Sequence, residues 1–247
     1  MPPHMSQAMM FNLVGTTLIV FALALHIVCL VTPHYSEIDL GHFGAKVSQL
    51  IKSMPNSTDS LDFEKLAQGE KGFKLDSIDT DINFGLWEIC ISGKSGVICK
   101  TWADIHDKNV PVGVESEAWL RSSQAMAIIG IILAFVTIII AIVNVVSRSR
   151  GDRLRLIHLF ISGGCFFAGF FILVGDLIVA ANYKDSLMLP VSLSADHVPQ
   201  VMVQYFKDQV NLSWGFALDI VAVALMGLAA MAHLMGGRIA KSENDVV

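Results

Sequence analysis

The sequence predicts an all-α membrane protein of four transmembrane helices, with a small β-structure in its largest outer loop. The 247 residues are 53% hydrophobic and only 16% charged, whereas soluble domains carry about 25% charged residues. The charge deficit is concentrated in four long apolar runs, and a short arginine-rich segment separates the second run from the third. A net charge of −5 gives no indication of nucleic-acid binding.

Each apolar run is near or above the length of about 20 residues that a helix needs to cross the hydrocarbon core. The first run is expected to remain as an uncleaved span, because the ten residues before it lack Lys and Arg and no small-residue cleavage site follows it. The predicted spans are residues 11–31, 122–146, 156–181 and 214–237.

The segment 147–155 between the second and third spans fixes the expected orientation. It carries Arg148, Arg150, Arg153 and Arg155, and short loops rich in Arg and Lys stay in the cytoplasm. The same arginines are expected to attract anionic lipid of the inner leaflet. The termini, 1–10 and 238–247, are then cytoplasmic, and the loops 32–121 and 182–213 are extracellular, which predicts a multi-pass protein of the plasma membrane.

Four cysteines are present, and only Cys90 and Cys99 lie in an outer loop. Disulfides form in oxidising compartments, so these two are the expected pair. The stretches 83–91 and 97–102 are rich in apolar residues and enclose a glycine-flanked turn, which predicts a hairpin.

If Lys94 and Ser95 are the two turn residues, Cys90 and Cys99 oppose each other as a non-hydrogen-bonded pair, about 4.5 Å apart at Cα. That separation suits a disulfide. Lys-Ser is not a favoured two-residue turn sequence, which leaves a longer loop open.

Two sequons lie in the outer loops. Asn56-Ser57-Thr58 stands in a polar part of the first loop, and we expect Asn56 to be glycosylated. Asn211-Leu212-Ser213 adjoins the fourth span, so we expect Asn211 to stay unmodified.

The motif Gly85-Leu86-Trp87-x-x-Cys90, followed by Cys99 in the larger first outer loop of a four-span chain, resembles the claudin superfamily. That superfamily includes claudins, peripheral myelin and epithelial membrane proteins, calcium-channel γ subunits and stargazin-type receptor regulators. The resemblance implies a left-handed four-helix bundle topped by a small, largely antiparallel sheet, with four strands from the first outer loop and one from the second. The fold of the polar insert 41–81 is left open.

Details of the motif differ among branches of the superfamily. Thr32-Pro33-His34-Tyr35 is similar to the γ subunits, with Tyr35 at the family's tryptophan, and Gln124 stands where barrier-forming claudins usually place an arginine. Tetraspanins, whose large loop follows the third span, and gap-junction proteins, with several cysteines in both outer loops, do not match. Clarins share an early sequon, but the cysteine hairpin favours the claudin side.

Three ionisable residues lie about six positions inside the outer ends of their spans, roughly 9 Å deep at the helical rise. Charged groups at that depth usually face the bundle interior or a partner. One interpretation is an interhelical clamp. The other is a proton- or cation-sensitive switch, or a docking point for a basic residue of a partner's span. This predicted intramembrane polar cluster is His26, Asp176 and Asp219.

The sequence contains no HExxH motif, phosphate-binding glycine loop or nucleophile elbow. His158 and His233 lack neighbours with metal-ligand spacing. We therefore expect a protein that is not an enzyme, with no cofactor and no catalytic or metal site.

Two functional hypotheses remain. One is organisation of cell contacts or junctions, with homo- or hetero-oligomers of claudin-like proteins. The other is an auxiliary subunit of an ion channel or receptor. The C-terminal Asp245-Val246-Val247 is also a candidate ligand for a PDZ scaffold.

Overall fold

The computed structural model describes residues 6–39, 81–93, 96–101, 117–147, 152–182 and 210–245. The chain divides into two compact units. One unit holds the helices and the other holds the sheet. The insert 41–81 lies outside the described residues except for Asp81.

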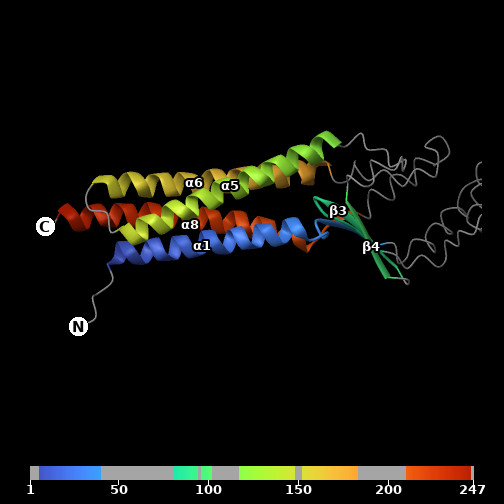
Figure 1. The fold of residues 1–247 in the computed structure, drawn as a ribbon, viewed down its shortest axis with the longest axis horizontal. Helices are drawn as coiled ribbons and strands as arrows, with labels where there is room; N and C mark the ends of the chain where they lie inside the picture. Colours follow the sequence, from blue (N-terminus) through green and yellow to red (C-terminus); the bar gives the residue numbers. More distant parts are fainter. Residues whose placement is uncertain are drawn as a thin grey trace, which may run out of the picture. The chain divides into compact units, whose positions relative to one another are not determined.

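Four helices lie side by side in the helical unit (Figure 1). All four are long and apolar enough to cross a membrane, which confirms the predicted number of spans. Their bounds are α1 Gln7–Val31, α5 Glu117–Ser147, α6 Asp152–Asn182 and α8 Trp214–Asp245.

The helices are longer than the predicted spans. Helix α6 begins at Asp152, inside the arginine-rich segment expected to be a loop, so that Arg153 and Arg155 belong to its first turn. Helix α8 continues to Asp245, well past the predicted end of the fourth span.

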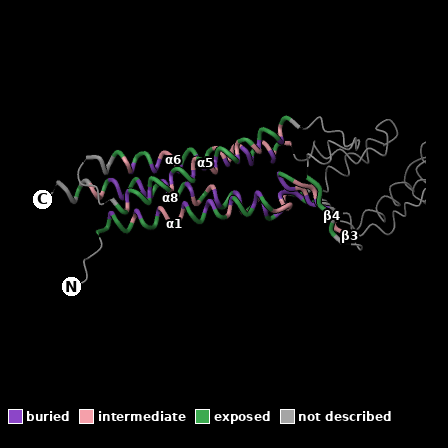
Figure 2. The backbone as a smooth tube through the Cα atoms, in the orientation of Figure 1, coloured by how far each residue is buried: buried purple, intermediate pink, exposed green. Residues whose placement is uncertain are grey.

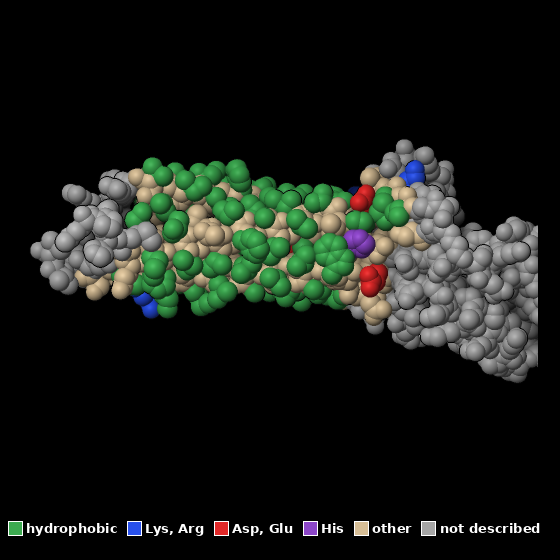
Figure 3. Space-filling view, turned by 90° about the horizontal axis from the view of Figure 1, so that it is seen from below, with side chains coloured by type: hydrophobic (Ala, Val, Ile, Leu, Met, Phe, Trp, Pro, Cys, Tyr) green, Lys and Arg blue, Asp and Glu red, His purple; other side chains and the backbone are tan. Residues whose placement is uncertain are grey.

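On every helix a set of buried residues recurs at alternating intervals of three and four positions, and buried and exposed parts alternate along each helix (Figure 2). An average interval of 3.5 residues is the repeat of left-handed helix packing. The outward faces carry apolar side chains that suit contact with lipid (Figure 3). On α1 the buried repeat is Ala8, Asn12, Gly15, Ile19, Ala22, His26 and Cys29, and on α5 it is Leu120, Ser123, Ala127, Gly130, Ala134, Thr137, Ala141 and Asn144.

Small residues let the helices approach closely. A Cβ atom added to Gly164 would clash with the Thr137 side chain on α5. One added to Gly169 would lie 3.2 Å from Cβ of Met226 on α8. Hydroxyl groups also bind across the bundle, since Ser162 Oγ donates to the carbonyl oxygen of Ala230 at 2.9 Å. Helix α6 therefore packs against both α5 and α8, as the small-residue interfaces of membrane helices allow.

In the part of the sheet unit that the structure describes, five antiparallel strands follow the order β4-β3-β2-β1-β5. Four strands come from the first outer loop and one from the second, which confirms the arrangement that the resemblance implied. Their bounds are β1 Ser36–Asp39, β2 Asp81–Phe84, β3 Glu88–Gly93, β4 Gly96–Thr101 and β5 Val210–Leu212.

One expectation about the strands is wrong. The sequence pattern predicts one strand over 83–91, but residues 85–87 divide this stretch into the end of β2 and the start of β3. The two parts fold back on each other, with Phe84 opposite Ile89. The physical reason is Gly85, whose N–H donates to the carbonyl oxygen of Glu88 at 2.8 Å and so closes a tight turn.

Candidate functional site

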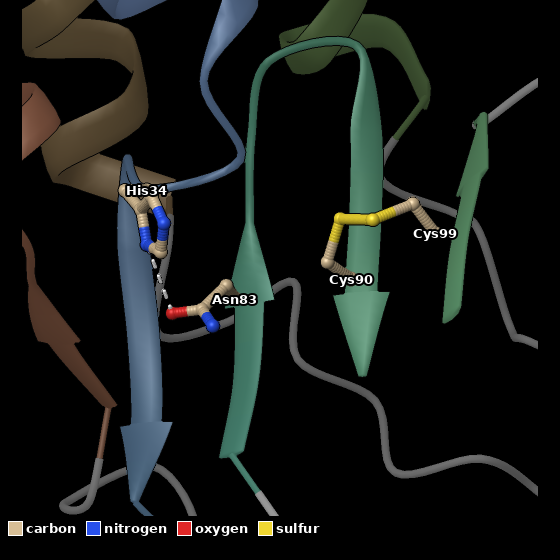
Figure 4. Close-up of a disulfide and its surroundings, with 4 residues drawn as sticks. All are labelled: His34, Asn83, Cys90 and Cys99. Carbon is tan, nitrogen blue, oxygen red and sulfur yellow. Dashed lines mark hydrogen bonds between the residues drawn. A yellow bond between two sulfur atoms is a disulfide. The ribbon is translucent and has the colours of Figure 1, made fainter. Parts of the chain in front are cut away.

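The sheet is braced by the predicted disulfide between Cys90 and Cys99 (Figure 4). The register of β3 and β4 pairs Gly93 with Gly96 and places the two cysteines directly opposite each other, with their Cα atoms 4.1 Å apart. Both findings agree with the expected hairpin. The turn residues Lys94 and Ser95 lie outside the described residues.

The Gly85-Leu86-Trp87 motif forms the turn between β2 and β3. A Cβ atom on Gly85 would lie 2.8 Å from Cα of Pro33, so the turn approaches the segment before β1 too closely for a side chain at position 85. Leu86 is buried, whereas Trp87 is 39% exposed. The motif therefore fixes a close backbone approach, and its tryptophan stays accessible.

A second set of contacts ties the two outer loops together. His34 lies 3.3 Å from Asn83, between Nδ1 and Oδ1 (Figure 4), and its ring centroid is 5.2 Å from that of Trp214. Ser213 Oγ donates to Glu37 Oε2 at 2.9 Å. The sequence offered His34 only as part of a family motif, because these contacts join residues far apart in the chain.

Tyr35 lies at the centre of this junction. Its N–H donates to the carbonyl oxygen of Phe84 at 2.9 Å, and its own carbonyl oxygen accepts from the N–H of Ser213 at 3.0 Å. The side chain is 4% exposed. Tyrosine at the position of the family's tryptophan thus fills a buried site in the sheet unit.

The helical unit contains an outer polar layer. His26 on α1 and Asp219 on α8 form a hydrogen bond of 2.5 Å between Nδ1 and Oδ1, with side chains 1% and 0% exposed. Asp176 on α6 is also buried. The structure therefore brings two members of the predicted cluster, His26 and Asp219, into direct contact, and it buries the third, Asp176, on α6.

An inner polar layer joins three helices. Asn12 on α1 lies 3.3 Å from Nε2 of His158 on α6, through its Nδ2, and 3.3 Å from Nδ1 of His233 on α8, through its Oδ1. The two imidazole centroids are 6.3 Å apart, and all three side chains are buried. The amide of Asn12 therefore bridges two histidines.

Glycines line this inner layer. A Cβ atom on Gly15 would lie 2.7 Å from the His233 ring, and one on Gly237 would lie 2.9 Å from Cβ of His158. Sequence reasoning did not single out Asn12, because an asparagine in an apolar run has no motif of its own. The available signal was that Asn12 and His26 occupy the same position of the seven-residue repeat on α1.

Several of the other predicted residues lie outside the described residues, namely Asn56, Arg148, Arg150, Val246 and Val247. Asp245 is the last residue of α8. Among the described residues, the one group with metal-ligand geometry is Glu88, Cys90 and Cys99. Its two cysteines are joined in the disulfide, so this group is not a metal site.

The family profile described as "PMP-22/EMP/MP20/Claudin family" matches residues 73–235, which are 163 of the 247 residues. The match includes the Gly85-Leu86-Trp87 turn, the disulfide hairpin, helices α5 and α6, and α8 as far as residue 235. No curated protein matches the chain.

Proposed function

Because the chain belongs to the PMP-22/EMP/MP20/Claudin family, we propose that this multi-pass membrane protein organises cell-surface contacts or junctions through its sheet unit, without catalysing a reaction. The observation that supports the proposal most directly is the disulfide-braced sheet formed by both outer loops. A braced sheet offers a rigid surface, and rigid surfaces lose less conformational entropy when they bind. Lateral contacts between helical units would assemble copies or relatives in one membrane.

Strand β4 is the part of this sheet best suited to meet a partner. It lies at one end of the strand order, and edge strands can pair with other chains. Val97 is 65% exposed on β4, and Lys100 and Thr101 are exposed as well. An exposed apolar side chain beside polar ones is a reasonable contact point on an extracellular surface.

The orientation proposed here places both termini and the segment 147–155 in the cytoplasm and the sheet unit outside. The four arginines of that segment support it through the positive-inside rule. In this orientation Asp245-Val246-Val247 would be available to a cytoplasmic PDZ scaffold, and an inner-leaflet lipid surface would face the arginines.

The test is imaging of a tagged protein in mixed cultures of expressing and non-expressing cells that lack their own junctions. Enrichment confined to borders between two expressing cells supports contact formation in trans. Val97→Lys should abolish that enrichment at an unchanged surface level, whereas the matched control Val97→Ile should retain it. Uniform distribution of the native protein would contradict the adhesion proposal.

A second candidate is an auxiliary subunit of an ion channel or receptor. Thr32-Pro33-His34-Tyr35, with Gln124 in place of the usual claudin arginine, supports this alternative. Here the sheet unit would contact the channel's outer face and the helices would pack against its spans. Co-purification of an ion channel from native membranes, together with uniform surface imaging, would favour this candidate over the first.

A further inference from the structure

The buried faces of α1 and α8 carry the same alternation of small and large residues. Within the buried repeat at intervals of three and four, small residues recur every seven positions on each helix, and a larger side chain lies between successive small ones. Two of the three larger residues of this repeat on each helix are polar, and the apolar one lies between them. The larger residues are Asn12, Ile19 and His26 on α1, and Asp219, Met226 and His233 on α8.

Two polar contacts set the antiparallel alignment of these helices. His26 binds Asp219, and Asn12 binds His233. The two α1 residues are 14 positions apart, and so are the two α8 residues, which corresponds to about 21 Å along each helix. Both contacts therefore fit one register, and Ile19 and Met226 occupy the layer midway between them. Ile19 and Met226 are fully buried in the same apolar cluster.

Apolar packing alone does not select this register. The small and large positions repeat every seven residues on both helices, so a shift of α1 by one repeat would again place large layers opposite large layers. The shift towards the C-terminus of α8 would, however, place His26 opposite Met226 and Ile19 opposite His233. Asp219 and Asn12 would then lose their hydrogen bonds to His26 and His233, and buried polar groups without partners are strongly unfavourable.

We propose that the two polar pairs are a register code that selects one alignment of α1 against α8. A buried polar residue within a helix repeat has this effect in coiled coils, where it fixes alignment at some loss of stability. Asn12 extends the code to α6 through its contact with His158. The code fixes α1 in particular, since the segment 32–116 separates α1 from the other three helices in sequence.

The polar pairs thus determine which alignment of α1 and α8 forms, and the packing of the bundle does not depend on them. Replacing all four residues by leucine leaves the helices apolar and able to pack, but removes the difference between the native and the shifted alignment. Exchanging the partners of one pair, as His26→Asp with Asp219→His, keeps the pair and should keep the register.

Cysteine cross-linking of the full chain in membranes measures the register. In a background with Cys29→Ala and Cys165→Ala, the pair Ala22→Cys and Ala222→Cys reports the native alignment, and Ala22→Cys with Ala229→Cys reports a shift of one repeat. All three alanines are fully buried in the same cluster. Cleavage at a protease site inserted within residues 62–72 separates α1 from the remaining helices. On a non-reducing gel the α1 fragment then stays attached to the rest of the chain only if the reporter cysteines have formed a disulfide.

With the native polar pairs, we expect cross-linking of the native reporter to exceed that of the shifted reporter at least tenfold. The fourfold variant Asn12→Leu, His26→Leu, Asp219→Leu and His233→Leu should cross-link both reporters to a similar extent. The matched control is Thr137→Val, because Thr137 is a buried polar residue of α5 that binds the carbonyl oxygen of its own helix at Leu133. It should keep the native preference.

An unchanged native preference in the fourfold variant would overturn the proposal. If the fourfold variant is degraded, the exchanged variant His26→Asp with Asp219→His provides the test. Cross-linking of the native reporter in the exchanged variant supports the register code. Equal cross-linking of the two reporters, or degradation of the exchanged variant as well, shows that these residues act in folding and are not interchangeable register partners.

Discussion

His26 and Asp219 form a pair whose members depend on each other, because both side chains lie almost entirely out of solvent. Removing one member of a buried pair leaves the other without its partner and costs about 3–5 kcal/mol. We therefore expect His26→Leu or Asp219→Leu alone to lower the free energy of unfolding by that amount. The double variant should lie within about 1–2 kcal/mol of the native protein, since apolar replacements of both partners are often neutral.

Thermal unfolding of the four proteins in one detergent gives this double-mutant cycle. A cycle in which the two single effects simply add would mean that the residues do not interact. The outer pair was foreseeable from the sequence because ionisable groups in apolar runs are rare. The inner bridge of Asn12 was not foreseeable, since it requires knowledge of which helix faces which.

Gly85 is the second residue whose role can be tested alone. Gly85→Ala would place Cβ against the backbone of Pro33, which cannot move aside as a flexible side chain could. Overpacking of this kind costs on the order of 1–3 kcal/mol, so we expect less protein at the cell surface. Flow cytometry with an outer epitope tag measures it. Gly163→Ala is the control, because a Cβ atom there meets nothing within 4 Å; an equal loss in both variants would rule out the close approach as the cause.

Among the elements, the hairpin of β3 and β4 was the most predictable. The glycine-flanked turn and the two cysteines indicated its register from the amino-acid sequence alone, and the register is confirmed at Cys90 and Cys99. The break between β2 and β3 was not predicted, because the apolar residues on either side of Gly85 continue the strand pattern. The break has a local part, the hydrogen bond from Gly85 N–H to Glu88, and a tertiary part, the close approach of the turn to Pro33 about 50 positions earlier, which the sequence pattern does not show.

The stabilisation of the hairpin by the disulfide should follow the length of the loop that it closes, and it grows with the logarithm of that length. Its cysteines are nine positions apart, and the chain-entropy relation gives about 2–3 kcal/mol for so short a loop. We expect Cys90→Ser with Cys99→Ser to lower the free energy of unfolding of the sheet unit by that amount. Hydrogen exchange of β3 and β4 measures the effect on this unit alone, and unchanged protection of both strands would contradict the prediction.

On the scale of the whole molecule, the proposed orientation makes a prediction about glycosylation. Asn56 should carry a sugar and Asn211 should not, because Asn211 lies in β5, paired with Glu37 of β1 and three positions before α8. Enzymatic removal of sugars should increase the gel mobility of the native protein but not that of Asn56→Gln. Asn211→Gln is the matched control and should still shift. A native protein that does not shift would remove this support for an extracellular first loop.

The four-span plan followed from composition and from the arginine-rich segment, because the bilayer imposes length and charge on a sequence directly. The alignment of the helices does not follow in this way, since lipid is as apolar as the residues that line the bundle. It depends on a few polar side chains and glycines whose partners are distant in the chain. For the same reason, the sequence identified a disulfide and a family but not the bridge between His158 and His233.

The order of the strands also has a consequence for biosynthesis. The Cys90–Cys99 hairpin uses neighbouring residues and can close as soon as this stretch emerges, whereas β1 cannot acquire its outer neighbour until Val210 has been made. At synthesis rates of about 5–20 residues per second, the 109 residues from Thr101 to Val210 correspond to a delay of roughly 5–20 s. During that interval one edge of β1 has no neighbouring strand, and an unpaired strand edge can bind another chain. A chaperone of nascent chains could therefore bind this edge until β5 pairs with β1.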